Sequence, residues 1–290
     1  MFDQRGVPML EDTFSDILGK ARFGKGWSLA DLSRKTHLPE NRMEALEGGA
    51  DPNQEEIERL SAALLLDPGK LAAIARAEWE PRPQEAIPMI RWIDGRIGTY
   101  PVNGYLFIDP ATRESALFDT GYSPDPVLAK IKKENLRLVA LFITHTHADH
   151  VGGADRIHAA TGAPIYLHPD EFSGGGRPPQ GATLLKEGME IPVGPFHVRH
   201  RRSPGHTPGG TTFVIEPAVG LNAPVAFVGD ALFAGSLGRA QSSSTYPLLL
   251  RSVREAILSL PGETCLFPGH GPATTVEEEQ RHNPFFTDPF

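Results

Sequence analysis

The chain has a single cysteine and no long apolar run. Cys265 has no second cysteine to pair with, which rules out an internal disulfide and suits a reducing compartment. No stretch is long and apolar enough to span a bilayer, and residues 1–14 lack the apolar core of a signal peptide. We therefore expect a cytoplasmic protein with no membrane partner.

Basic residues are also in deficit. The 28 Lys and Arg residues face 36 Asp and Glu residues, which gives a formal net charge of −8. This balance argues against general affinity for nucleic acid or anionic membranes, while a local basic patch stays open. With 290 residues, of which 40% are hydrophobic, the chain can bury a sizeable core in one large or two smaller domains.

The sequence pattern in the first quarter of the chain predicts short helices. Apolar residues recur at helical spacing from Phe14 to Ala21, and Ser28 is a typical N-cap for the helix that follows. Another helix is expected to start at Pro39 and to stop at Gly48, as a glycine C-cap would stop it. We predict a small all-α domain over residues 1–80.

A proline-rich segment and a change of pattern follow. Residues 81–88 contain three prolines, which disfavour helix and sheet and predict a semi-rigid linker. We expect this linker to make the first domain separable. From residue 89 to 290, short Val, Ile, Phe and Leu runs alternate with Gly and Pro turns and a few helices, which predicts an α/β domain.

Residues 145–150 contain the densest cluster of potential metal ligands in the sequence. This run places three imidazoles and a carboxylate directly after the apolar stretch 138–143. Neutral imidazole nitrogens and carboxylate oxygens suit zinc and related divalent ions, and they seldom cluster for packing reasons. Three later residues, each set among Gly or Pro, strengthen the pattern. The candidate ligands are His145, His147, Asp149, His150, His206, Asp230 and His270.

These motifs resemble the metallo-β-lactamase superfamily, especially its glyoxalase II-like thioesterases, over about residues 89–286. The resemblance implies a four-layer αβ/βα sandwich. It also implies one metal bound by His145, His147 and His206, and another bound by Asp149, His150 and His270, with Asp230 bridging both. Asp119, in the run Phe-Asp-Thr-Gly, matches a position that supports the metal loop.

The implied chemistry is hydrolysis. Two divalent ions ~3.5–4 Å apart lower the pKa of a bridging water, and the hydroxide attacks a carbonyl carbon. We expect a hydroxyacylglutathione hydrolase-like thioesterase acting on a small acyl substrate, either a thioester or a related ester or lactone. Asp149 and Asp230 are the catalytic carboxylates, and Zn²⁺ is the expected metal, with Fe and Mn as alternatives. Tyr166 falls where glyoxalase II has a substrate-binding tyrosine.

The first segment resembles the helix-turn-helix domain of the phage-repressor (XRE) family. The matching stretches are 27–33, 36–38 and 43–49. In that family the helix after the turn reads the major groove, and here it would present Glu40, Asn41, Arg42 and Glu44. Two carboxylates against one guanidinium make a poor surface for DNA. Residues 1–85 hold 11 basic and 16 acidic residues, so dimerisation or docking stands level with DNA binding.

Three functions therefore stay open. The first is a metal-dependent hydrolase with an accessory, oligomerising helical domain. The second is a DNA-binding regulator whose metal domain senses or clears a metabolite. The third is an oxygenase similar to persulfide dioxygenases, with one iron bound by His145, His206 and Asp230. The remaining histidines have no motif match, and Cys265 is expected to be buried rather than catalytic.

Overall fold

The computed structural model describes residues 9–84, 87–218 and 220–287. Residues 85 and 86 of the expected linker, and the first eight residues, lie outside the described ranges. The N-terminal part is helical, as predicted from its apolar spacing. Its helices are α1 (Phe14–Gly24), α2 (Leu29–Thr36), α3 (Glu40–Glu47), α4 (Gln54–Leu64) and α5 (Pro68–Ala75).

Local sequence signals explain where these helices begin and end. The Ser28 side chain accepts a hydrogen bond from the Asp31 backbone, and Asp31 reaches back to the Ser28 backbone, which forms a capping box. Helix α3 begins after Pro39 and ends at Gly48, as predicted. We call α1–α5 the N-terminal helices. The boundary at residue 80 and the helix-turn-helix assignment stay predictions.

Two six-stranded mixed sheets follow. The first has the order β1-β2-β3-β4-β5-β6 and the second β14-β13-β10-β9-β8-β7. The first comprises β1 (Ile90–Ile97), β2 (Tyr100–Ile108), β3 (Glu114–Phe118), β4 (Arg137–Phe142), β5 (Ile165–Leu167) and β6 (Ala182–Leu184). The second comprises β7 (Ile191–Val193), β8 (Phe196–Arg202), β9 (Thr211–Ile215), β10 (Val225–Gly229), β13 (Cys265–Pro268) and β14 (Thr274–Thr275).

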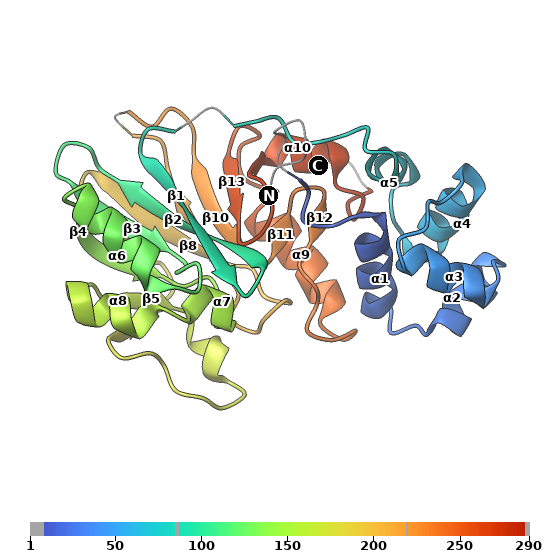
Figure 1. Ribbon diagram of the computed structural model, residues 1–290, viewed down its shortest axis with the longest axis horizontal. Coiled ribbons are helices and arrows are strands. Elements are labelled where there is room, and N and C mark those ends of the chain that lie inside the picture. The colour runs from blue at the N-terminus through green and yellow to red at the C-terminus, as the bar shows by residue number, and fades with distance from the viewer. Residues whose placement is uncertain (1–8, 85–86, 219, 288–290) are drawn as a thin grey trace.

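Successive side chains along each strand point to opposite faces of the sheet, so the two faces contribute to different hydrophobic clusters. On β10, Val225 and Phe227 join the cluster between the sheets, while Ala226 and Val228 face the helices outside. On β2, Phe107 points between the sheets and Leu106 points to the opposite helical layer. This period of two produces the layered α/β arrangement that the sequence predicts (Figure 1).

Helices cover both outer faces. The first sheet carries α6 (Pro124–Lys133) and α8 (Ala154–Thr161), and the second carries α9 (Tyr246–Ala256) and α10 (Val276–His282). Three short elements complete the α/β part. They are α7 (Ala148–Val151), the 3₁₀ turn η1 (Pro169–Phe172) and the hairpin of β11 (Leu232–Phe233) and β12 (Ser236–Leu237). No helix in the described part of the chain is long and apolar enough to cross a membrane.

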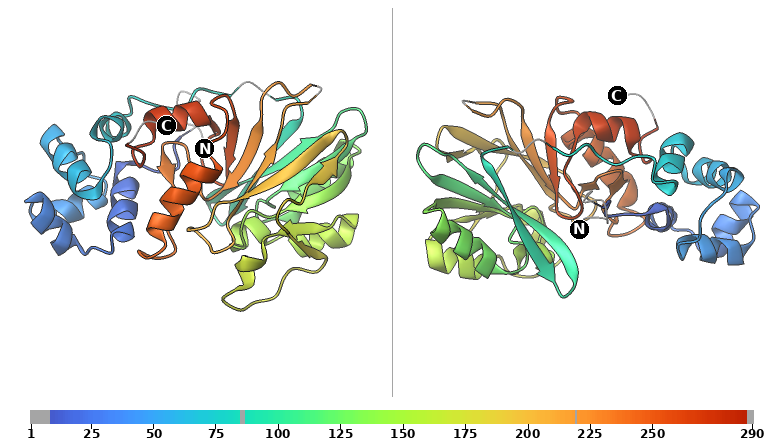
Figure 2. Two further views of the ribbon diagram at one scale, coloured as in Figure 1. Left: turned by 180° about the vertical axis from the view of Figure 1, so that it is seen from behind. Right: turned by 45° about the horizontal axis from the view of Figure 1, so that its top comes forward.

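The N-terminal helices do not form a detached unit. Their buried side chains belong to the same hydrophobic cluster as those of α9, α10 and the outer face of the second sheet. Figure 1 and Figure 2 show the N-terminal helices, in blue, beside the orange and red C-terminal helices. Trp79 stacks on His282 with ring centroids 5.0 Å apart, and Lys70 donates to the carbonyl of Gln280.

This packing argues against the separability expected from the linker prolines, and a deletion of residues 1–80 would test it. Prolines disfavour helix and sheet locally, but they do not prevent the flanking elements from packing against each other. Here the N-terminal helices pack on one another and also share one hydrophobic cluster with residues from Val214 onward.

Candidate metal centre

The candidate ligands come from loops that meet at one edge of the two sheets. Strands β8, β10 and β13 run in the same direction, because β9 is antiparallel to both β8 and β10 and β13 is parallel to β10. His206, Asp230 and His270 follow the carboxyl ends of these strands. The run 145–150 follows β4 and forms the start of α7.

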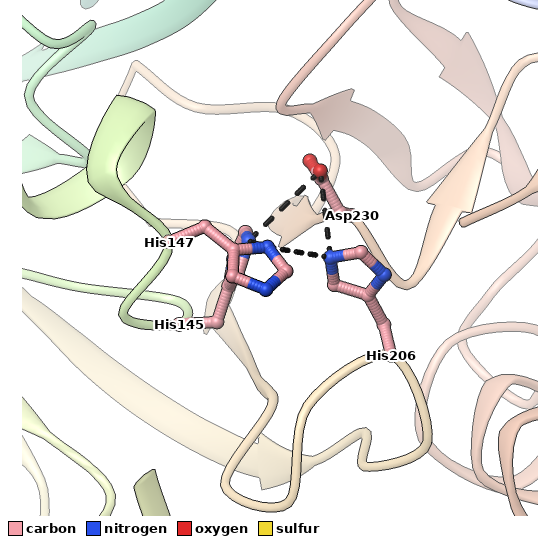
Figure 3. A group of neighbouring side chains, drawn as sticks. All are labelled: His145, His147, His206 and Asp230. Carbon is pink, nitrogen blue, oxygen red and sulfur yellow. Dashed lines mark hydrogen bonds and ion pairs between the residues drawn. The ribbon is translucent and has the colours of Figure 1, made fainter. Parts of the chain in front are cut away.

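The first group is made of His145, His147, His206 and Asp230, and we call it the His145 half-site. Figure 3 shows these side chains pointing toward one another. The Nδ1 atom of His147 lies 3.1 Å from Nε2 of His145 and 3.0 Å from Nε2 of His206. The Oδ2 atom of Asp230 lies 3.9 Å from Nε2 of His145 and 3.7 Å from Nε2 of His206.

The second group is made of Asp149, His150 and His270, and we call it the His270 half-site. Nε2 of His270 lies 3.3 Å from Oδ2 of Asp149 and 3.5 Å from Oδ2 of Asp230. Nε2 of His150 lies 3.3 Å from Oδ1 of Asp230. Asp230 therefore stands between the two groups: its Oδ2 atom lies near ligands of both, and its Oδ1 atom faces His150.

The outer nitrogens of two imidazoles are engaged by backbone carbonyls that fix the ring orientation. Nδ1 of His206 donates to the Arg239 carbonyl at 2.7 Å, and Nδ1 of His270 donates to the Pro101 carbonyl at 2.8 Å. In the neutral imidazole such a bond leaves Nε2 unprotonated, which is the form that binds a metal. Because both carbonyls are backbone groups, residue type gives no sequence signal for them.

Asp119 ties the loop of the first ligands to the His270 half-site. Its carboxylate accepts hydrogen bonds from the backbone and the hydroxyl of Thr144, each at 2.8 Å. It also lies 2.8 Å from Nδ1 of His150. A buried carboxylate with these three partners holds the His150 ring and the turn after β4 in one arrangement. Its expected support of the metal loop stays a prediction.

Glu171 is a contributor that the sequence reading missed. One carboxylate oxygen accepts from the backbone and hydroxyl of Thr146, both at 2.7 Å, and the other accepts from Thr207 and Gly209. Glu171 therefore clamps the loop of His145 and His147 to the loop of His206. A lone glutamate 25 residues after Thr146, in a turn of its own, carries no motif that could have revealed this role.

The electrostatics of the cluster fit a cation. In the described structure Nε2 of His150 and Oδ1 of Asp230 are buried without a hydrogen-bond partner. Burial lowers the pKa of His150, but the carboxylates of Asp230 and Asp119 outweigh it and hold that pKa well above its usual value. Burial likewise opposes the charged form of His270, yet hydrogen bonds to Asp149 and Asp230 raise its pKa to about 10. His150 and His270 therefore hold protons that balance the charge of Asp149 and Asp230. A divalent ion at the same place would balance these carboxylates instead.

Two glycines leave room for the ligands. A Cβ on Gly269 would lie 2.2 Å from Oδ1 of Asp230 and 2.4 Å from Cε1 of His150. A Cβ on Gly238 would lie 1.6 Å from the Asp230 carbonyl. Any larger residue at these positions would displace Asp230 or its neighbours.

The other residues singled out from the sequence lie elsewhere. Tyr166 sits on β5 with its ring stacked on Phe142, and it borders the cluster between the sheets, so its role with substrate stays a prediction. Cys265 is buried on β13, as expected, and burial raises the pKa of its thiol to about 12. Arg201 and Arg202, at the end of β8, are engaged by the Ala256 carbonyl and Asp170 respectively.

Comparisons with known proteins agree with this arrangement. The chain is 32% identical over 212 residues to the probable metallo-hydrolase YqgX of Bacillus subtilis, covering 68% of this chain and 97% of that protein. It is 30% identical to the hydroxyacylglutathione hydrolase GloC of Haemophilus influenzae, over 60% of this chain and 87% of that protein. It is 35% identical to the human mitochondrial persulfide dioxygenase ETHE1, over 63% of this chain and 70% of that protein.

A solved structure and a family model are also of metallo-β-lactamase type. The structure of the B3 metallo-β-lactamase BLEG-1 aligns with a TM-score of 0.61 and 30% identity, covering 69% of this chain and 100% of that one. The model of the metallo-β-lactamase superfamily matches residues 97–270, which include all the candidate ligands. With its α/β sandwich and its His/Asp cluster suited to metal ions, the chain belongs to the metallo-β-lactamase superfamily of metal-dependent hydrolases.

Proposed function

We propose that this protein is a binuclear metal-dependent hydrolase of a small thioester or a related ester or lactone. The observation that carries the proposal is the pair of half-sites joined by Asp230. The similarity to a protein named hydroxyacylglutathione hydrolase supports the thioester as substrate. We also propose that the protein works in the cytoplasm.

The residues of the His145 half-site would hold one divalent ion and those of the His270 half-site the other, with Zn²⁺ as the favoured metal. When bound, such ions supply a water of lowered pKa and stabilise an oxyanion. Asp230 orients both half-sites, and Asp149 presents a carboxylate near their junction. Burial opposes the charged form of Asp149, but the hydrogen bond from His270 and the charges of His150 and His270 together lower its pKa, so this side chain is ionised at neutral pH.

Metal content tests this proposal directly. We expect about two divalent ions per chain in the purified protein, and we expect His206→Ala to lose at least one, since Nε2 of His206 points into the His145 half-site. Elemental analysis gives the stoichiometry, and turnover of thioester and lactone substrates gives the activity. His197→Ala is the matched control, because His197 is exposed on β8 and belongs to neither half-site.

One observation favours a second candidate. The similarity to the human persulfide dioxygenase is as high as that to the hydrolases. An oxygenase of this kind would use a single iron held by His145, His206 and Asp230. A preparation with one iron per chain that consumes oxygen with persulfide substrates, and does not hydrolyse thioesters, would replace the hydrolase proposal by this one.

For the N-terminal helices we propose a role other than sequence-specific DNA binding. The guanidinium of Arg42, on α3, makes two hydrogen bonds to Glu56 at 2.6 and 2.9 Å and one to the Asp51 carbonyl. These bonds support the proposal, because they engage the one basic side chain of the helix that would enter the major groove, and Glu40 and Glu44 next to it are exposed.

We therefore expect no sequence-selective duplex binding in a mobility assay with genomic fragments at low salt. Asn41→Ala serves as the diagnostic variant, because Asn41 is exposed and its replacement leaves the pair of Arg42 and Glu56 intact. Submicromolar, selective binding that Asn41→Ala abolishes would instead make this chain an enzyme and regulator in one.

A further inference from the structure

The imidazole of His270 is flanked by two aromatic rings. The ring of Tyr100 lies 4.9 Å from it, centroid to centroid, with a tilt of 42°. The ring of Phe233 meets it edge-on at 5.8 Å. Between them, these rings and the Pro101 carbonyl determine the direction in which Nε2 of His270 points.

The segment that leads into α1 holds the first of these rings. The Tyr100 hydroxyl donates a hydrogen bond to the carboxylate of Glu11. The Glu11 backbone itself lies against Gly271, where an added Cβ would be only 3.1 Å from the Glu11 nitrogen. Tyr100 is 47% exposed, so its position against His270 depends on this bond rather than on burial.

Helix α1 holds the second ring. The ammonium group of Lys20 lies 4.7 Å from the centroid of Phe233, within the range of a cation–π interaction. Lys20 also donates to the Leu237 carbonyl at 2.8 Å and pairs with Asp12. Asp12 is buried and accepts a hydrogen bond from Ser236. The hairpin β11–β12 is thereby fastened to α1.

We propose that residues 11–20 position His270 and thereby set the affinity of the His270 half-site for its metal ion. Glu11 and Lys20 are then positioning residues, acting through Tyr100 and Phe233. Glu11 and Lys20 precede residues 97–270, the part of the chain that matches the family model. The two contacts that position His270 therefore come from outside the matched region. The inference concerns metal binding alone and does not depend on the substrate.

The test is a titration of the metal-free, full-length protein with Co²⁺ in competition with a chromophoric chelator, followed by the visible absorption of the bound cobalt. The wild-type protein should bind two ions, and His206→Ala and His270→Ala identify which phase belongs to which half-site. Glu11→Ala should weaken the His270 phase by about tenfold, the lower end of the effect of losing a partner that orients a ligand. The His145 phase should change less than about twofold.

Two further variants separate positioning from a general loss of structure. Glu11→Gln keeps an acceptor for the Tyr100 hydroxyl and should bind both ions nearly as the wild type does. Tyr100→Phe keeps the ring but removes the donor, so it should match Glu11→Ala, and the double variant should add no further loss. Arg34→Ala, on the exposed face of α2, is the control within the N-terminal helices.

Three results would overturn the inference. The first is unchanged cobalt affinity in both Glu11→Ala and Tyr100→Phe. The second is an equal loss from both half-sites together with a lower melting temperature, which would mean that these residues only support the fold. The third is uptake of a single ion by the wild-type protein under saturating cobalt.

Discussion

Replacing Asp149 with alanine is expected to lower kcat on the order of 100- to 1,000-fold while changing KM far less. Among the described residues, the His270 half-site contains one carboxylate, that of Asp149. Its Oδ2 atom lies 3.3 Å from Nε2 of His270 and 3.7 Å from Nε2 of His150, at the point where the reacting water would be oriented. Under the proposed function Asp149 acts on the reacting water rather than on the substrate, so the loss should appear in turnover.

Steady-state kinetics of the metal-loaded protein, with metal content measured on the same sample, would check this expectation. Asp125→Ala is the matched control, because Asp125 is exposed on α6, where it pairs with Arg156, and belongs to neither half-site. Near-normal turnover in Asp149→Ala would mean that the second metal position is dispensable, and it would favour a mononuclear enzyme.

Deleting residues 1–80 is expected to destabilise the protein severely and to cost activity through loss of fold. The deletion would remove a large part of one hydrophobic cluster and expose apolar side chains of α9 and α10. Exposed apolar patches of this kind lead to aggregation. The truncated chain should therefore accumulate in the insoluble fraction or unfold at a much lower temperature than the full chain.

A single substitution probes the same interface more gently. Trp79 is buried, stacks on His282 and closes over Gly235, where an added Cβ would lie 2.6 Å from its ring. Trp79→Ala should lower the free energy of unfolding by about 3–5 kcal/mol in urea titrations. Leu65→Ala, at a position 67% exposed, should change it by less than about 0.5 kcal/mol. A stable, active protein lacking residues 1–80 would show that the shared core contributes little.

The sequence was most informative where local rules decide the outcome. The capping residue Ser28 and the stop at Gly48 give helix ends directly, because caps act within one turn. The metal cluster was also foreseeable, since His and Asp residues after apolar strands converge when those strands share an edge. The structure brings the predicted ligands into two groups, while their metal-binding roles remain to be measured.

Long-range partnerships were beyond the sequence. Apolar residues at helical spacing show that a helix buries one face, but not which element covers it, so the packing of α1 and α5 on the C-terminal helices had no signal. No sequence motif indicated the contacts of Glu171 or those of the Arg239 and Pro101 carbonyls either. Each acts through a contact between loops that only the completed fold brings together.

The shared core also has a consequence for the order of events on the ribosome. The N-terminal helices leave the exit tunnel first, yet the surface that covers them, from β11 to the end of α10, is made last. At about 5–20 residues per second, the intervening stretch takes on the order of 10–40 s to synthesise. Throughout that interval the side of the helices that packs on this surface is uncovered, so we expect the nascent chain to recruit chaperones that bind early and release late.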